Sequence, residues 1–135
     1  MLDFVAMFDL VDNKVSTDLI IEFYTSHKIV SAVCHGSAAL LKATLPDGTL
    51  FLKGEKVTGF SNQEEIDVDR QKDMPFHLET ALDVASGGGY EKADKAWDEK
   101  VVVSFESGKR LLTGQNPGSA KRVAEELLRL LEIGA

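Results

Sequence analysis

The chain has 135 residues, of which 44% are hydrophobic and 27% are charged, and this is the size and composition of one globular domain. Its 15 basic and 22 acidic residues leave a net charge of −7, which disfavours nucleic acid as a partner. The single cysteine excludes an intramolecular disulfide and fits a reducing compartment. Because the sequence shows no signal peptide and no window near the ~18 apolar residues of a membrane span, we expect a soluble protein of the cytoplasm, with the nucleus as a second location, and no membrane partner.

The first predicted elements alternate between helix and strand. Ser16 can cap a helix that runs to about His27, and a β-branched strand follows at residues 29–33. Because this strand is apolar on both faces, it is typical of a buried parallel strand. A helix rich in small residues is predicted at residues 37–42.

The middle of the chain predicts two short strands and two helices. The strands are residues 50–52 and 56–60, and Ser61 or Asn62 can cap an acidic helix over residues 63–69. Pro75 suits the first turn of a helix over residues 76–86, which stops at the glycines that follow.

The last third of the chain predicts a hairpin and a final helix. Residues 101–113 form the hairpin, with a turn at residues 107–109, and Pro117 opens the helix with Asn116 as its cap. Strands that alternate with helices indicate a single α/β domain with a mainly parallel sheet, in which the hairpin is the antiparallel part.

The chemistry is predicted where the strand at residues 29–33 runs into Cys34 and turns sharply into the small-residue helix. This is the layout of a nucleophile elbow, in which the turn lifts a side chain above the sheet edge. Backbone N–H groups at the start of the helix stabilise a thiolate there, so Cys34 is the candidate nucleophile. The alternative is a cysteine that is buried as a small hydrophobic residue.

Three further side chains are candidates for the site. His35 is a proton carrier to a substrate bound over the thiolate, or a surface histidine that tolerates the turn. Glu64 and Glu65 follow the strand that ends at Phe60, and the carboxyl ends of parallel strands share one edge, so a carboxylate there can orient an imidazole. Spacing alone slightly favours the alternative that both glutamates form the solvated first turn of a helix. The sequence shows no metal-ligand spacing and no nucleotide-binding motif, so we expect no metal and no cofactor.

Several ordered blocks carry a resemblance to a known family. The run AVCHGSAALL at residues 32–41 resembles the elbow of the PfpI superfamily of class I glutamine amidotransferase-like proteins, which usually has proline where Ser37 stands. The run KGEKVTGFSNQEE at residues 53–65 resembles the next strand and acidic turn of that family. Further blocks match at residues 6–10, 75–79, 93–97 and 112–120, so the resemblance extends over residues 6–131.

The resemblance implies a fold and a function. The fold is a flavodoxin-like three-layer α/β sandwich with a mainly parallel sheet, as one domain over residues 1–135. The most similar branch contains glyoxalase III-type proteins, also described as stress-inducible chaperones. It implies a lyase of the D-lactate dehydratase type that converts methylglyoxal, a small 2-oxoaldehyde, to D-lactate without glutathione. The alternative is a stress chaperone or redox-responsive protein without catalysis, or an inactive fragment.

The resemblance also implies roles for single residues. Cys34 matches the nucleophile, His35 its catalytic partner, and Glu65 the acidic member that completes the triad. Glu65 is assigned by matching the block that ends in Gly59 and Phe60, and Glu64 is the alternative one residue away.

The start of the chain departs from the family pattern. Family members carry several βα units before the block at residues 6–10, so we expect an N-terminally truncated chain that represents the C-terminal portion of the fold. Where the run LDFV stands at residues 2–5, the family has a Gly-Gly-His-Gly-like loop whose backbone N–H groups help to stabilise an oxyanion. Without the preceding units a strand edge lies open, and we therefore expect a homo-oligomer or a self-associating chain.

Overall fold

In the computed structural model, which describes residues 3–105 and 110–133, the described strands form one sheet in the order β1-β3-β2. β1 (Val30–Val33) pairs in parallel with β3 (Leu111–Gly114), and β3 pairs antiparallel with β2 (Val101–Ser104). The predicted antiparallel hairpin is confirmed, and its predicted turn at residues 107–109 lies outside the described residues. β1 forms one edge of the sheet, because no other described strand pairs with its outer side.

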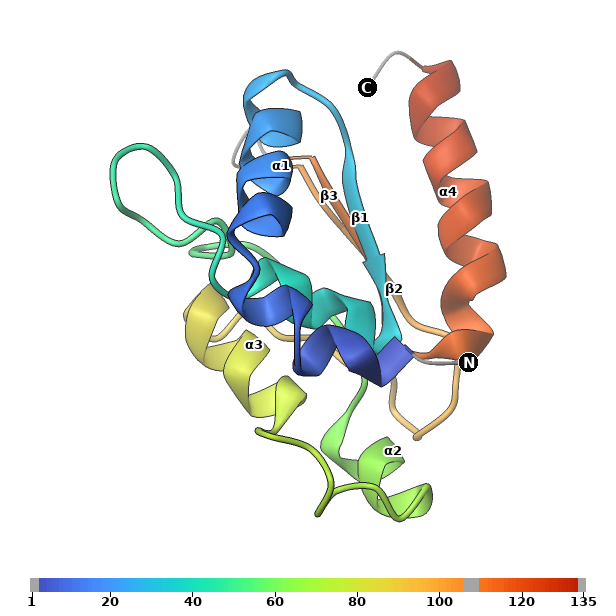
Figure 1. Ribbon diagram of the computed structural model, residues 1–135. Helices are drawn as coiled ribbons and strands as arrows, with labels where there is room; N and C mark the ends of the chain where they lie inside the picture. Colours follow the sequence, from blue (N-terminus) through green and yellow to red (C-terminus); the bar gives the residue numbers. More distant parts are fainter. Residues whose placement is uncertain (1–2, 106–109, 134–135) are drawn as a thin grey trace.

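Helices cover both faces of this sheet, which confirms the predicted α/β class (Figure 1). α1 (Lys14–Thr25) lies on one side of β1, and α4 (Ala120–Glu132) lies on the other. Three 3-10 segments pack together beside α1: η1 (Asp3–Met7), η2 (Leu10–Asp12) and η3 (Cys34–Leu40). α2 (Asn62–Asp67) and α3 (Leu78–Ser86) lie at the end of the molecule toward which β1 points.

Local capping signals set the ends of the helices. α1 begins before the predicted cap Ser16, because the side chain of Asn13 accepts the Ser16 N–H at 3.0 Å and so starts the helix earlier. For α2 the cap is Ser61, the first of the two predicted candidates. α3 ends at Gly87, whose φ of 76° is the left-handed conformation that suits glycine at a helix end.

The prediction of a strand at residues 56–60 is wrong, because this segment does not pair along its length with any described strand of the sheet. It forms one isolated parallel bridge, between Val57 and Tyr90. The Thr58 N–H donates to Thr113 Oγ1 of the neighbouring β3 at 3.0 Å. A side-chain hydroxyl group therefore takes the place that a backbone carbonyl has in a regular ladder. Residues 50–52, the other predicted short strand, lie in a turn after a single bridge at Leu50. Both segments are tied to the fold by isolated contacts that a sequence pattern does not encode.

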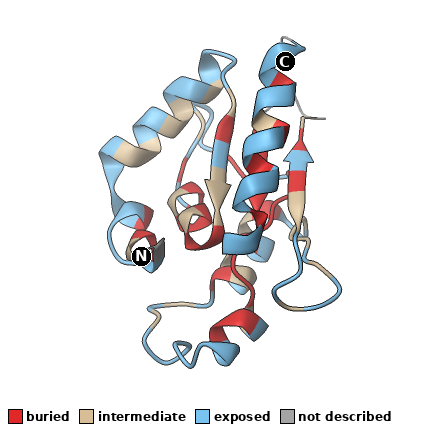
Figure 2. Ribbon diagram, turned by 90° about the vertical axis from the view of Figure 1, so that its right-hand side faces the viewer, coloured by how far each residue is buried: buried red, intermediate tan, exposed pale blue. Residues whose placement is uncertain are grey.

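The apolar core lies beneath the turn that follows β1. The largest fully buried apolar side chains come from η1, from η3 and the turn after it, from α3 and from the sheet: Met7, Leu40, Phe51, Leu52, Leu78, Leu82, Leu111 and Leu112. α1 differs from the other long helices, because none of its residues is fully buried (Figure 2). The turn at Cys34 is therefore built into the core, whereas α1 lies at its margin.

Candidate active site

Cys34 lies at the junction of β1 and η3 with a φ of 59°, in the left-handed region. An L-residue other than glycine rarely adopts this conformation, and such strain gathers at functional sites. The predicted small-residue helix is a 3-10 segment that begins at Cys34 itself. The sharp turn supports the elbow interpretation, and it leaves the cysteine side chain only 4% exposed at the wall of a cavity.

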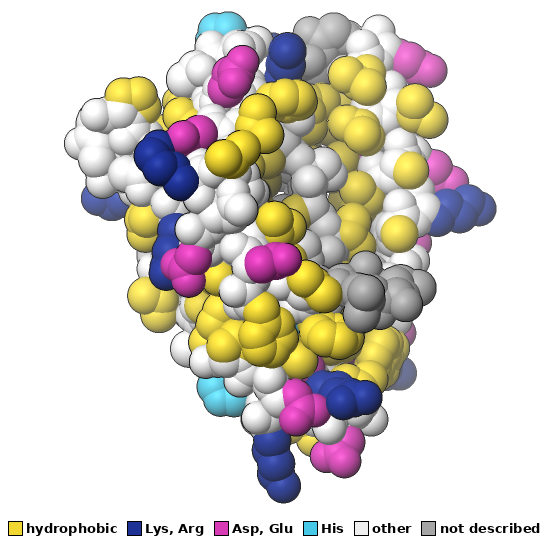
Figure 3. Space-filling view, viewed as in Figure 1, with side chains coloured by type: hydrophobic (Ala, Val, Ile, Leu, Met, Phe, Trp, Pro, Cys, Tyr) yellow, Lys and Arg dark blue, Asp and Glu magenta, His cyan; other side chains and the backbone are white. Residues whose placement is uncertain are grey.

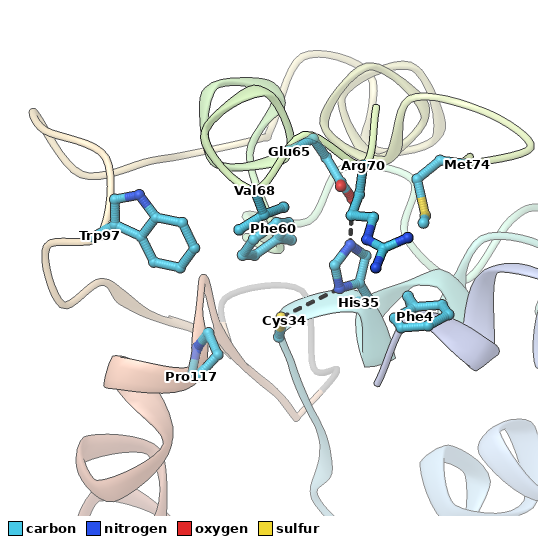
Figure 4. A pocket seen from close by; sticks show the side chains of 10 residues that line it. All are labelled: Phe4, Cys34, His35, Phe60, Glu65, Val68, Arg70, Met74, Trp97 and Pro117. Carbon is cyan, nitrogen blue, oxygen red and sulfur yellow. Dashed lines mark hydrogen bonds and ion pairs between the residues drawn. The ribbon is translucent and has the colours of Figure 1, made fainter. Parts of the chain in front are cut away.

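The His35 imidazole lies between the sulfur and a carboxylate (Figure 4). Its Nδ1 is 3.4 Å from Cys34 Sγ, and its Nε2 is hydrogen-bonded to Glu65 Oε1. Its ring also packs on Phe60, with 4.4 Å between the ring centroids. His35 is 7% exposed, so the alternative of a surface histidine is wrong. The three side chains named by the family resemblance therefore form one chain of contacts, from the thiol through the imidazole to the carboxylate.

Glu64 and Glu65 are both buried, at 0% and 3% exposure, and this contradicts the alternative of a solvated helix start. Glu65 Oε2 has no hydrogen-bond partner among the described residues, so this carboxylate is committed to His35 through its other oxygen. Glu64 points elsewhere and forms a capping box with Ser61, whose N–H donates to Glu64 Oε2 at 2.8 Å.

The second oxygen of Glu64 joins the loops around the site. Oε1 accepts the Trp97 N–H at 3.0 Å and Asn116 Nδ2 at 2.8 Å. Burial raises the pKa of the Glu64 carboxyl, but the hydrogen bonds from Ser61, Asn116 and Trp97 outweigh it and hold the pKa below its ordinary value of 4.5. Glu64 is therefore an ionised structural anchor, and it is Glu65 that reaches the imidazole.

These groups open into a cavity of about 270 Å³. Cys34, His35 and Glu65 form its reactive side, and most of the remaining wall is apolar. That wall comes from segments far apart in the chain: Phe4, Phe60, Val68, Met74, Trp97 and Pro117 (Figure 4). The volume is near the lower end of ligand pockets, ~300 Å³, and fits a molecule of a few heavy atoms.

Sequence reasoning assigned only Cys34, His35 and Glu65 to the site, and it missed the other lining residues, among them Phe4 and Arg70. Phe4 belongs to the run LDFV at residues 2–5, and the only signal for its position was the predicted departure of this run from the family pattern. Arg70 follows Asp69, whose left-handed φ of 52° turns the chain back toward the cavity. Aspartate adopts this conformation more often than most residues do, but that preference alone does not place the turn at residue 69.

Among residues 3–105 and 110–133, no group of three or more His, Cys, Asp or Glu side chains is placed to hold a metal ion. In the same part of the chain, no helix has the length and apolar character needed to cross a membrane.

Comparison with known proteins identifies relatives of this chain, although no family model matches it. It is 32% identical over 131 residues to Glyoxalase 3 of Candida albicans, covering 93% of this chain and 53% of that protein. It is 34% identical over 122 residues to the glutathione-independent glyoxalase HSP31 of Saccharomyces cerevisiae, covering 87% of this chain and 50% of that protein. The chain thus spans about half the length of the curated relatives that it matches.

Solved structures agree with the sequence relatives. The Rapid Encystment Protein of 24 kDa from Francisella tularensis superposes with a TM-score of 0.84 at 31% identity, covering 92% of this chain and 52% of that chain. The crystal structure of glyoxalase III from Candida albicans superposes with a TM-score of 0.78 at 28% identity, covering 92% of this chain and 52% of that chain. The chain therefore has an α/β fold like that of PfpI-type proteins. Its relatives within that class are the glutathione-independent glyoxalases, as the sequence blocks predict.

Proposed function

We propose that this chain carries the reactive centre of a glutathione-independent glyoxalase that converts methylglyoxal to D-lactate. The observation that supports the proposal is the line from Cys34 through His35 to Glu65 at the wall of a cavity of about 270 Å³. A cysteine beside an imidazole that a carboxylate orients is the arrangement that activates a thiol for attack on a carbonyl.

The proposed reaction begins with addition of the Cys34 sulfur to the aldehyde carbon. The thiol proton passes to His35 and then to the former carbonyl oxygen, which gives a hemithioacetal. A base, His35 or a carboxylate, next removes the proton on that carbon, and an enediol forms. Protonation of the neighbouring carbon yields a thioester of lactate, and water cleaves it to D-lactate and the thiol. The net reaction is methylglyoxal plus water to lactate. Its steps are addition of the thiol to a carbonyl, proton transfers and hydrolysis of the thioester, so no external oxidant or reductant is consumed.

The test is formation of D-lactate from methylglyoxal by the purified chain. The proposal predicts D-lactate from the wild-type protein and none from Cys34→Ala at the same concentration. A folded wild-type chain that forms no D-lactate would contradict it, and so would equal formation by the alanine variant. Circular dichroism of both proteins checks that they are folded.

A second role, as a chaperone without catalysis, is favoured by exposed apolar surface. A groove of about 700 Å³ lies between η1, η2 and α3, and its lining includes Phe8, which is 53% exposed, and Val84, which is 76% exposed. Exposed apolar patches of this kind mark binding surfaces on soluble proteins. Suppression of the aggregation of a denatured client by Cys34→Ala, as effective as that by the wild type, would support this role, and loss of suppression in the variant would contradict it.

A further inference from the structure

The cavity contains one charged group that the proposed reaction does not use. Arg70 is the only Lys or Arg among the described residues that line it. Its backbone N–H donates to the Glu65 carbonyl at 3.1 Å, which fixes its position close to that glutamate. Figure 4 shows the Arg70 guanidinium directed into the cavity, beside the His35 ring and near Phe4.

The charges around Arg70 leave its guanidinium available to a ligand. One nitrogen, Nη1, pairs with Asp73 Oδ2 at 3.1 Å, and both side chains are more than half exposed. An exposed pair of this kind contributes little to stability and exchanges readily with solvent. A guanidinium has five N–H donors in a planar fork, so the contact with Asp73 does not exhaust it. The one carboxylate in the cavity wall, Glu65, is hydrogen-bonded to His35.

We propose that Arg70 makes this cavity a binding site for a small carboxylate, held next to the Cys34 sulfur. The anion site rests on the geometry of the cavity alone, whereas its role in turnover rests on the proposed function. In that reaction negative charge collects on the substrate oxygens during enediol formation, and the product is itself a carboxylate. Arg70 then supplies the one positive side chain among the described residues that line the cavity.

The single cysteine allows a test that does not depend on glyoxalase turnover. Iodoacetate and iodoacetamide both form an S–C bond to Cys34 and release iodide, but only iodoacetate carries a carboxylate. The ratio of their rates on the native chain therefore measures how strongly the cavity attracts an anion. We expect Arg70→Gln to lower the ratio of the iodoacetate rate to the iodoacetamide rate by about three- to tenfold, the effect of one unit charge at contact range in partly solvated surroundings.

Three matched variants separate the site from general charge effects. Lys72→Gln makes the same charge change on an exposed residue outside the cavity wall and should leave the ratio unchanged. Arg70→Lys keeps the charge and should retain most of the preference. Asp73→Asn removes the competing carboxylate and should raise the ratio.

D-lactate provides a second readout. It should slow the labelling of wild-type Cys34 by iodoacetamide and should lose this effect in Arg70→Gln. The proposal is overturned if Arg70→Gln leaves the rate ratio unchanged, or changes it no more than Lys72→Gln does. A chain that shows the charge preference but makes no D-lactate from methylglyoxal would contradict the proposed function and leave the carboxylate site standing.

Discussion

Two adjacent glutamates in α2 take different positions, and this division predicts different effects of the same substitution. Glu65 bonds to the His35 ring, whereas Glu64 bonds to Ser61, Trp97 and Asn116. Glu65→Gln removes the charge that orients and supports the imidazole. We expect it to lower the kcat for methylglyoxal by about 100-fold, the range of a lost acid–base function. Glu64→Gln should lower kcat much less.

The comparison requires that both variants are measured well below their unfolding temperatures. Equal and small losses of kcat in both would mean that neither carboxylate supports the imidazole. A larger loss in Glu64→Gln would reverse the assignment that the hydrogen bonds indicate.

The anchor role of Glu64 predicts a pH dependence of stability. Because its pKa is lowered in the folded chain, the ionised carboxylate stabilises the fold above its ordinary value of 4.5, and this contribution is lost as the pH falls through the lower folded value. Glu64→Gln should reduce the free energy of unfolding near neutral pH by about 1.5–3 kcal/mol, the range for hydrogen bonds to a charged group. Urea unfolding should show this difference shrinking as the pH falls below 4.5. A difference that stays constant down to pH ~3 would argue against an ionised anchor.

The order of the predicted elements indicated that Cys34 and a carboxylate lie close together, but it did not indicate which glutamate contacts His35 or that Arg70 lines the cavity. Cys34 and Glu65 meet because the segment at residues 56–60, although it is not a ladder strand, runs beside β3 and ends next to Cys34, whose carbonyl accepts the Phe60 N–H at 3.4 Å. The order of the elements predicts this shared end. Spacing did not separate Glu64 from Glu65, because adjacent helix residues point ~100° apart and the capping box at Ser61 decides which one faces His35. Arg70 was not predicted, since its place depends on the left-handed turn at Asp69.

At the scale of elements, close approach of α4 to the sheet predicts a glycine requirement. A Cβ at Gly114 would lie 2.7 Å from Val123 Cγ2 and 3.2 Å from Ser119 Cβ. Gly114→Ala should therefore push α4 away from β3 and lower the free energy of unfolding by about 1–3 kcal/mol, as overpacking does. Urea unfolding measures this change.

Gly36 supplies the matched control for this prediction. A Cβ there would meet nothing within 4 Å, and no left-handed φ constrains it. Gly36→Ala should change stability by less than about 1 kcal/mol. Equal losses in the two variants would indicate that both alanines act through the backbone and that the helix–sheet contact does not matter.

The strand predictions succeeded where a backbone ladder forms and failed where side chains replace it. β1, β2 and β3 are β-branched or leucine-rich runs that pair through regular hydrogen bonds, and all of them were predicted. The segment at residues 56–60 also contains β-branched residues, Val57 and Thr58, but Thr113 meets it with a hydroxyl group. The pattern of residue types in a segment indicates how buried the segment is. It does not indicate whether a backbone N–H of that segment bonds to a carbonyl or to a side chain.

At the scale of the whole molecule, the face that contains the outer edge of β1 is apolar. A hollow of about 300 Å³ beside it is lined by uncharged residues of α1, of β1 and of the position just before β1: Leu19, Ile20, Phe23, Ile29, Val30 and Ser31. Figure 3 shows hydrophobic side chains on both sides of this hollow, and α4 adds Leu128 and Leu131, which are more than half exposed. We propose that a second copy of the chain covers this face by pairing its own β1. None of the described residues that line the hollow is charged, although each copy carries a net charge of −7.

Ser31→Pro tests this pairing. The Val30 N–H donates to the Arg110 carbonyl at 2.8 Å, and because amides alternate along a strand, the Ser31 N–H points to the outer edge. Proline at Ser31 removes that donor and leaves the bond to β3 intact. Light scattering after size exclusion should show a dimer or larger species for the wild type and a monomer for Ser31→Pro.

Two further observations check the interpretation of this experiment. Ser31→Thr keeps the N–H group and should remain associated. Association should strengthen as salt rises, because salt screens the repulsion between two copies of charge −7. A monomeric wild-type chain at all salt concentrations would rule out the β1 interface, and so would equal association of the proline variant.

The covalent role of Cys34 is tested most directly with methylglyoxal that carries carbon-13 at its aldehyde carbon. The purified chain, at a concentration equal to that of the substrate, is followed by carbon-13 NMR, with Cys34→Ala as control. We predict a signal from a carbon bonded to sulfur in the wild type, absent in the variant, that decays as labelled D-lactate appears. Formation of D-lactate at the same rate by Cys34→Ala would contradict it, as would a folded wild-type chain that shows neither the sulfur-bonded carbon nor the product.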